Sequence, residues 1–96
     1  MALFAVIRRR ADGWDRSRPI EGQQAWRPHA EFMNDLERDG FALLSGPLGD
    51  SEEILLIVRT NAAAEIGPRL AADPWTELGL LETVRITPWA LRIGSL

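Results

Sequence analysis

The sequence predicts a single α+β domain, and three observations support this fold class. Two continuous apolar runs, residues 3–7 and 54–58, are typical of central strands that are covered on both faces. Helix signals follow each of these runs, so strands and helices are expected to alternate along the chain. The 96 residues are 46% hydrophobic and 26% charged, which suits one globular domain spanning residues 1–96.

The first half of the chain is expected to hold a strand, a loop and a helix. The strand covers residues 3–7, and residues 11–22 form a loop because they carry Gly, Pro, Ser and alternating charges. Trp14 stands in this loop with no amphipathic pattern to account for it. Pro28 suits the first turn of a helix, and Gly40 suits its end. One stripe of this helix should face a sheet; it consists of His29, Phe32, Met33 and Leu36.

The middle of the chain is expected to hold two strands. The first covers residues 41–44 and should end at Ser45-Gly46-Pro47, before a turn at residues 48–51. The second is the apolar run 54–58. A helix should follow, capped by Thr60 or Asn61.

Proline positions organise the last third of the sequence. Gly67-Pro68 should kink the second helix because proline has no backbone N–H to donate. Asp73-Pro74 is typical of the N-cap and first residue of another short helical turn. In the last strand Val84 and Ile86 are expected to point inward, and Pro88 restricts the strand to an edge or a strand end.

The resulting order is β-α-β-β-α-β, which is the ferredoxin-like plan of an antiparallel sheet with helices on one face. Its first and third strands are central, and here they are the two apolar runs. Two helices can cover only one face of the sheet, so the other face is expected to pack against a second copy of the chain. The sequence therefore predicts a homodimer in which the two sheets form a dimeric α+β barrel.

Missing residue types restrict the possible chemistry. There is no Cys and no Tyr, and all 11 basic residues are Arg, which excludes disulfides, thiolate sites, Schiff-base lysines and P-loop lysines. The one histidine, His29, cannot form a conventional zinc centre without Cys or further His. We expect no metal and no cofactor, and any acid–base chemistry falls on His29 and the carboxylates.

The charge pattern bears on partners and location. The net charge of −3 argues against nucleic-acid binding. The cluster Arg8–Arg10 is interpreted as a solvated strand end, with an anion-steering rim as the alternative. Strand alternation lets only one or two of these arginines face a pocket. The N-terminal apolar run is too short for a signal peptide or a membrane span, so a cytoplasmic protein without membrane contact is expected.

His29 and Asp73 are the candidate catalytic pair. The stripe places His29 at the helix–sheet junction, and the start of the first helix could meet the end of the second across one end of the fold. A carboxylate on one imidazole nitrogen fixes the tautomer and raises the basicity of the other nitrogen. The competing interpretations are a packing role for His29 and a purely capping role for Asp73.

Five further residues are candidates for binding a small-molecule ligand. Ser45 could donate a hydrogen bond, and a Ser–His–Asp hydrolase is disfavoured because no G-x-S-x-G elbow is present. Trp26 and Trp75 lie close in sequence to the proposed pair and would suit a planar ligand, or simply cover a small core. The candidate binding residues are Ser45, Gly46, Pro47, Trp75 and Arg8.

The chain resembles the YCII-related (YciI-like) family. The resemblance rests on Trp26–Ala30, on Gly40–Pro47 ending in Ser-Gly-Pro, on Ala72–Trp75, and on Val84–Trp89 with its Pro-Trp pair. It implies a ferredoxin-like fold that dimerises, similar to muconolactone-isomerase-type proteins, and an active site built on a His–Asp pair that maps onto His29 and Asp73. Some relatives act as dehydrochlorinase-type lyases on chlorinated aromatic compounds.

Two classes of function remain open at this level. The first is a cofactor-independent lyase or isomerase acting on a small cyclic or aromatic molecule, with His29 as general acid or base and Asp73 orienting it. The second is a non-catalytic dimeric module that binds a small molecule or a partner. A third interpretation makes the His–Asp pair part of the core only.

Overall fold

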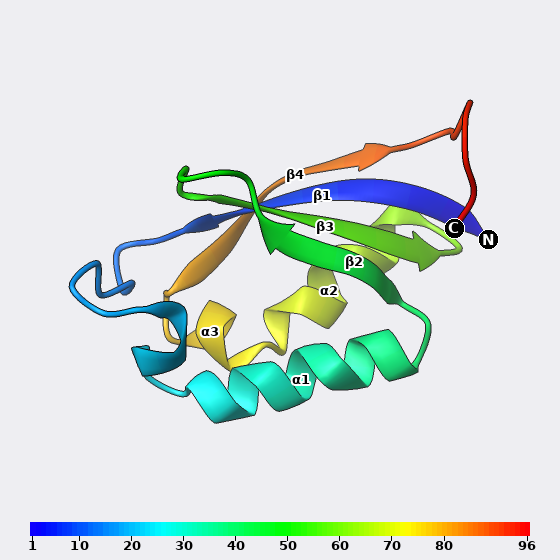
Figure 1. The fold of residues 1–96 in the computed structure, drawn as a ribbon. Coiled ribbons are helices and arrows are strands. Elements are labelled where there is room, and N and C mark those ends of the chain that lie inside the picture. The colour runs from blue at the N-terminus through cyan, green and yellow to red at the C-terminus, as the bar shows by residue number, and fades with distance from the viewer.

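The computed structural model describes residues 1–96 and has the predicted order of elements (Figure 1). The strands are β1 (Ala2–Arg10), β2 (Ala42–Pro47), β3 (Glu53–Thr60) and β4 (Leu81–Pro88). The α-helices are α1 (Trp26–Arg38), α2 (Ile66–Ala71) and α3 (Pro74–Glu77), and the short 3-10 turns are η1 (Ile20–Gly22) and η2 (Ala63–Glu65). No helix combines the length and the apolar character needed to cross a membrane.

The four strands form one antiparallel sheet in the order β2-β3-β1-β4. The two apolar runs are the central strands β1 and β3, as predicted, because only these strands have neighbours on both sides. Figure 1 shows α1, α2 and α3 together on one face of the sheet. The α+β, ferredoxin-like fold class is thereby confirmed.

The core between sheet and helices has two parts. The larger cluster joins both central strands to α1 and α2 and consists of Phe4, Val6, Leu36, Phe41, Ala42, Leu56, Val58, Ile66 and Leu70. The smaller cluster consists of Trp14, Trp75, Leu80 and Leu81. Trp14, which the sequence pattern left unexplained, is thus a core residue supplied by the loop after β1. The smaller cluster lies beside the candidate site.

Strand β2 is longer than predicted. Ser45, Gly46 and Pro47 do not end the strand but continue it, opposite Leu56, Leu55 and Ile54 of β3. Proline is tolerated here because β2 is an edge strand and Pro47 needs no donor on its open side.

The prediction for Val84 was wrong. Ile7 lies opposite Arg85 while Arg8 lies opposite Thr83, so Val84 is an extra residue in a β-bulge. Val84 is exposed, whereas Ile86 packs against the larger core cluster as expected. A bulge shifts the alternation of side chains, and its position cannot be read from a period-2 pattern.

The start of α2 also differs from the prediction. Thr60 lies in β3 and Glu65 occupies the N-cap position without a side-chain hydrogen bond, so neither Thr60 nor Asn61 caps the helix. Gly67-Pro68 lies in the first turn of α2, where a backbone N–H has no helical partner and a proline therefore loses no hydrogen bond. This pair therefore begins the helix instead of kinking it.

The central part of the sheet face opposite the helices is apolar. Ala5 and Ile57 are cross-strand partners, as are Ile7 and Leu55, and all four alternate with core residues along β1 and β3. Ile57 is only 3% exposed within the single chain, whereas Leu44 beside it on β2 is 56% exposed. The centre of this face is therefore shielded by its own neighbours, and its β2 edge is open.

Candidate functional site

Asp73 is held at the start of α3. Its Oδ1 accepts the Trp75 backbone N–H at 2.9 Å, and Pro74 is the first helical residue, as the sequence predicts for an N-cap. The Asp73 side chain is 0% exposed. A carboxylate this deeply buried needs further polar partners.

His29 is one of these partners. It lies in the first turn of α1, where its backbone N–H donates to the carbonyl of Ala25, a residue in the left-handed region (φ 57°). Its Nδ1 lies 2.9 Å from Oδ1 and 3.0 Å from Oδ2 of Asp73. The predicted contact between His29 and Asp73 is therefore present, across 44 positions of sequence.

Arg8 is the second partner, and the interpretation of this residue as part of a solvated strand end was wrong. Its Nη1 donates to Asp73 Oδ2 at 2.9 Å and its Nη2 donates to Thr76 Oγ1 at 2.7 Å. The Arg8 side chain is 2% exposed, whereas Arg9, its neighbour on β1, is exposed and pairs with Glu82. Alternation on the strand separates the two arginines, and only Arg8 turns toward α3.

These contacts hold Asp73 in its ionised form. Burial raises the pKa of the Asp73 carboxyl, but the hydrogen bonds from His29, the Trp75 backbone and Arg8 outweigh it, and the pKa lies below its ordinary value of 3.8. An ionised carboxylate only accepts hydrogen bonds, so the proton of the shared bond belongs to His29 Nδ1. In the neutral imidazole, Nε2 is then the free base.

Trp75 supports the ring of His29 from one side. The two rings stack at 3.7 Å between centroids with an interplanar angle of 8°. The indole Nε1 of Trp75 donates to the Gln24 carbonyl at 2.6 Å, and Trp14 packs against Trp75 edge-on at 5.1 Å. Two contacts therefore restrain the Trp75 ring independently of His29, and Trp75 in turn restrains the orientation of the imidazole.

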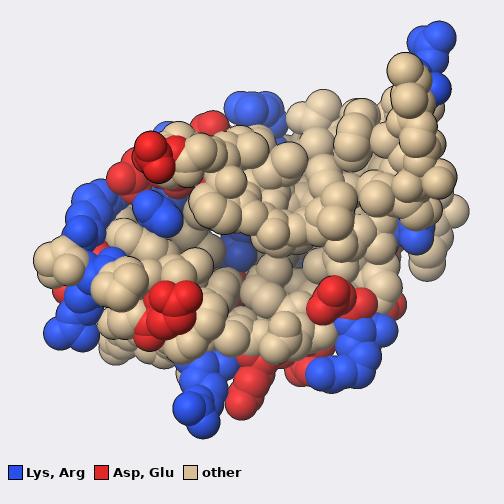
Figure 2. All heavy atoms as spheres, in the orientation of Figure 1, with Lys and Arg blue, Asp and Glu red and all other residues tan.

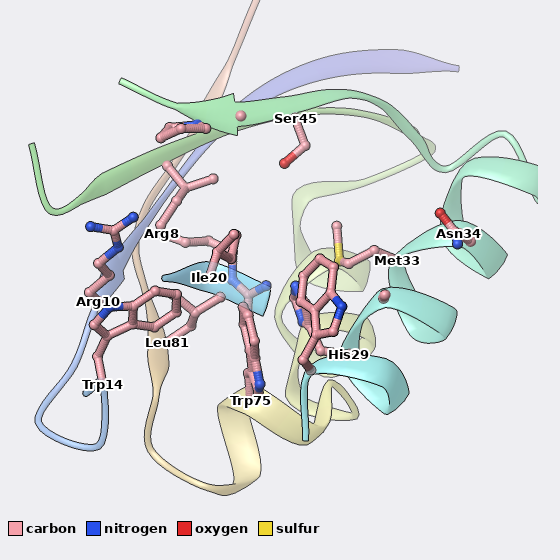
Figure 3. A pocket seen from close by; sticks show the side chains of 15 residues that line it. Arg8, Arg10, Trp14, Ile20, His29, Met33, Asn34, Ser45, Trp75 and Leu81 are labelled. Atoms are coloured by element: carbon pink, nitrogen blue, oxygen red, sulfur yellow. The ribbon is translucent and has the colours of Figure 1, made fainter. Parts of the chain in front are cut away.

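A pocket of about 330 Å³ opens beside His29, between the sheet and α1. Figure 2 shows this hollow, with blue arginine atoms inside it. In Figure 3, Arg10 and Trp14 lie on one side of the pocket and His29 and Met33 on the other, with Trp75 between them. The volume falls within the range of about 300–1,000 Å³ that is usual for small-molecule sites.

All the predicted binding residues line this pocket, namely Arg8, Ser45, Gly46, Pro47 and Trp75. Asp73 does not line it, so it can act on a ligand only through the pocket residues that it contacts, His29 and Arg8. His29 Nε2 has no hydrogen-bond partner in the chain and is not among the fully buried unpartnered atoms. The free nitrogen of the pair is thus accessible.

The strand residues on β2 contribute in different ways. Ser45 and Pro47 pair with Leu56 and Ile54, which pack toward the helices, so their side chains point to the pocket side. Gly46 alternates with them and offers only its backbone to the pocket. Ser45 makes no hydrogen bond to His29, so the side chains do not form a Ser–His–Asp triad.

The prediction that one or two of the arginines Arg8–Arg10 face a pocket is confirmed, since Arg8 and Arg10 both line it, although Arg10 was not named as a binding residue. Met33, Ile54 and Leu81 also line the pocket, together with Trp14 from the loop, and were not predicted to do so. Alternation from Arg8 would have identified Arg10, and the helical stripe already contained Met33. No local signal marks the other positions. The chain contains no group of three or more His, Asp or Glu side chains arranged to hold a metal ion.

Comparison with known proteins adds one finding. No family model and no curated protein matches this chain. Among solved structures it is similar to 5-chloro-2-hydroxyhydroquinone dehydrochlorinase (TftG) from Burkholderia phenoliruptrix AC1100, in its complex with 2,5-dihydroxybenzoquinone. The TM-score is 0.58 at 23% sequence identity, and the match covers 92% of this chain and 93% of that chain. At this identity the likeness shows a shared fold.

Proposed function

We propose that this chain is a cofactor-independent enzyme, a lyase or isomerase that acts on a small cyclic or aromatic molecule by general acid–base catalysis. One observation carries the proposal: buried, ionised Asp73 fixes His29 through Nδ1 and leaves Nε2 free beside an apolar pocket. A base held in this way can remove a proton from a bound ring or its hydroxyl group, which is typically worth about 10²–10⁴ in rate.

Dehydrochlorination is the reaction we favour within this class. From the keto tautomer of the substrate, which has a hydrogen on the chlorine-bearing carbon, Nε2 of His29 takes a hydroxyl proton. The O–H electron pair forms a C=O bond, the ring double bonds shift, and the C–Cl bond breaks so that chloride leaves with its bonding electron pair. The net change is loss of HCl, so the step consumes no oxidant or reductant. The similar fold of a dehydrochlorinase and the aromatic lining from Trp14, Trp26 and Trp75 support this choice.

Family membership and assembly form part of the same proposal. We assign the chain to the YCII-related family on the motifs around His29, Ser45 and Asp73. We also propose a homodimer in which the apolar sheet faces meet, with exposed Leu44 at the edge of that contact. Both assignments agree with the fold, and the dimer has its own test below.

The function is tested with chlorinated di- and trihydroxybenzenes as candidate substrates. Chloride release and the absorbance of the quinone product are followed for the wild type, His29→Asn, Asp73→Asn and the surface control Asp35→Asn. We expect His29→Asn to lower kcat by about 10²–10⁴ and Asp35→Asn to leave it unchanged. If the wild type binds these compounds and returns them unchanged, the chain is a binding module.

The tautomer provides a check that does not depend on the substrate. The chain has one histidine, so ¹⁵N-histidine labelling gives one imidazole signal set. We expect a protonated Nδ1 and an unprotonated Nε2 in the neutral ring, and loss of this preference in Asp73→Asn. A wild-type ring protonated at Nε2 instead would contradict the proposed base.

A further inference from the structure

Arg10 is a cation in the pocket without an anion to balance it. It is the second arginine of β1 on the pocket side, two residues beyond Arg8. Its Nε is buried and has no hydrogen-bond partner. Arg8 and Arg9 both have carboxylate partners, Asp73 and Glu82, whereas no acid pairs with Arg10.

None of the nearby acids forms an ion pair with Arg10. A surface hollow that Arg10 also lines contains Asp12, Glu52 and Glu82, and Asp12 pairs with no arginine. Glu52 pairs with Arg16 and Glu82 pairs with Arg9, so neither neutralises Arg10. No Asp or Glu lines the main pocket, and the charge of Arg8 is balanced by Asp73. The guanidinium of Arg10 therefore has no carboxylate among the pocket-lining residues to pair with it.

The guanidinium of Arg10 is held in place in spite of lacking a partner. It lies over the ring of Trp14, 4.6 Å from the centroid, and the Arg10 backbone N–H donates to the Glu52 carbonyl at 2.9 Å. Cation–π stacking fixes the plane of the guanidinium and leaves its edge free to donate. A fixed donor that is part-buried and unpaired costs desolvation energy in the free protein, which an anionic ligand would recover.

Arg10 and the proposed base His29 lie on opposite sides of the pocket. Figure 3 places Arg10 and Trp14 across the pocket from His29. Arg8 lines the same pocket two residues before Arg10, and its Nε is also buried without a hydrogen-bond partner. A ring lying between the two sides would meet guanidinium donors at one end and the imidazole at the other.

We propose that Arg10 is a specificity-determining residue that binds an ionised oxygen of a planar cyclic ligand. The ligand class is a ring bearing a phenolate, enolate or carboxylate, and the choice of a ring rests on the proposed function. Trp14 positions the guanidinium, so the loop after β1 contributes to the site through this contact. Neutral rings of the same shape should bind more weakly, because they leave the charge of Arg10 unbalanced.

The test compares two probes of nearly the same shape, benzoate and benzamide, which differ in charge. Binding to the intact protein is measured by titration calorimetry at neutral pH. We expect the wild type to bind benzoate at least about 10-fold more tightly than benzamide, because a charge-assisted hydrogen bond replaces a neutral one. Arg10→Gln should lose this preference, and Arg10→Lys should keep part of it. Arg9→Gln is the matched control, on the same strand but on the opposite face, and should retain the full preference.

Each result of these titrations either supports or overturns the proposal for Arg10. Equal binding of the two probes by the wild type, or no measurable binding of either, overturns the proposal, as does an equal effect of Arg9→Gln and Arg10→Gln. His29→Asn separates the Arg10 proposal from the catalytic proposal, since it should lower kcat by about 10²–10⁴ and preserve the preference for benzoate. A wild type that prefers benzoate yet turns over no substrate would refute the catalytic function and leave the anion site standing.

Discussion

Asp73→Asn is the substitution that most directly tests the buried polar centre. Asn has nearly the same shape as Asp and retains an oxygen to cap α3, so the change removes charge with little change in packing. Arg8, 2% exposed, is then left without its counterion, and His29 loses a charged acceptor. The perturbation is therefore electrostatic and confined to the centre of the site.

The expected magnitude follows from burial. Removing one partner of a buried ion pair typically costs about 3–5 kcal/mol, because the remaining charge stays buried. Asp35→Asn provides the matched control, since Asp35 pairs with Arg38 at 2.6 Å on the surface. An exposed pair of this kind is worth about 0–1 kcal/mol. A domain of this size has about 5–15 kcal/mol of stability in total, so Asp73→Asn should remove a large part of it.

Urea unfolding followed by tryptophan fluorescence measures the difference. With m-values of about 1–3 kcal/mol/M, Asp73→Asn should lower the midpoint by more than about 1 M, and Asp35→Asn should change it little. The double variant Arg8→Met/Asp73→Asn should recover part of the loss, because no charge is then left unpaired. Equal effects of the two Asn substitutions, or strict additivity in the double variant, would refute the reasoning.

Three further outcomes are expected. The pKa of Asp73 lies below its ordinary value of 3.8, so ionisation of Asp73 stabilises the fold fully above about pH 4, and this contribution is lost as the pH falls through the native pKa. The urea midpoints of the wild type and Asp73→Asn should therefore converge in acid. A difference between the two midpoints that does not change with pH would contradict the lowered pKa. A Cβ on Gly13 would lie 2.8 Å from the Gly79 carbonyl, so Gly13→Ala should cost about 1–3 kcal/mol and alter Trp14 fluorescence, whereas Gly67→Ala, with open space around it, should be neutral or stabilising in thermal unfolding. Leu44→Arg at the exposed edge of the sheet should shift the proposed dimer to monomer in sedimentation velocity, and a wild type that is monomeric would exclude that dimer.

The fold was largely predictable because its signals are local. Continuous apolar runs identified β1 and β3 as central strands, and the spacing of His29 and Leu36 identified the buried face of α1. Asp73-Pro74 marked the start of α3 correctly, since capping depends on adjacent residues. The errors at Val84 and at Ser45–Pro47 arose where pairing with a neighbouring strand decided the local structure.

The site was predictable only in part, and Arg8 shows why. The composition pointed to His29 and Asp73, because a chain with one histidine and no Cys, Lys or Tyr has few other groups for acid–base chemistry. The partner of Arg8 lies 65 positions away, and no pattern in the N-terminal segment distinguishes an arginine paired with Asp73 from a solvated one. Likewise, the stacking of Trp75 on His29 depends on the approach of α3 to α1.

The sequence by itself determined the order of elements, the central strands and the acid–base inventory, since these follow from periodicity, capping and composition. Only the tertiary structure decided which arginine is neutralised, which nitrogen of His29 is free, and which side chains meet in one pocket. Those properties depend on contacts between residues far apart in the chain. Burial there fixes charge and tautomer, and no local pattern encodes that burial.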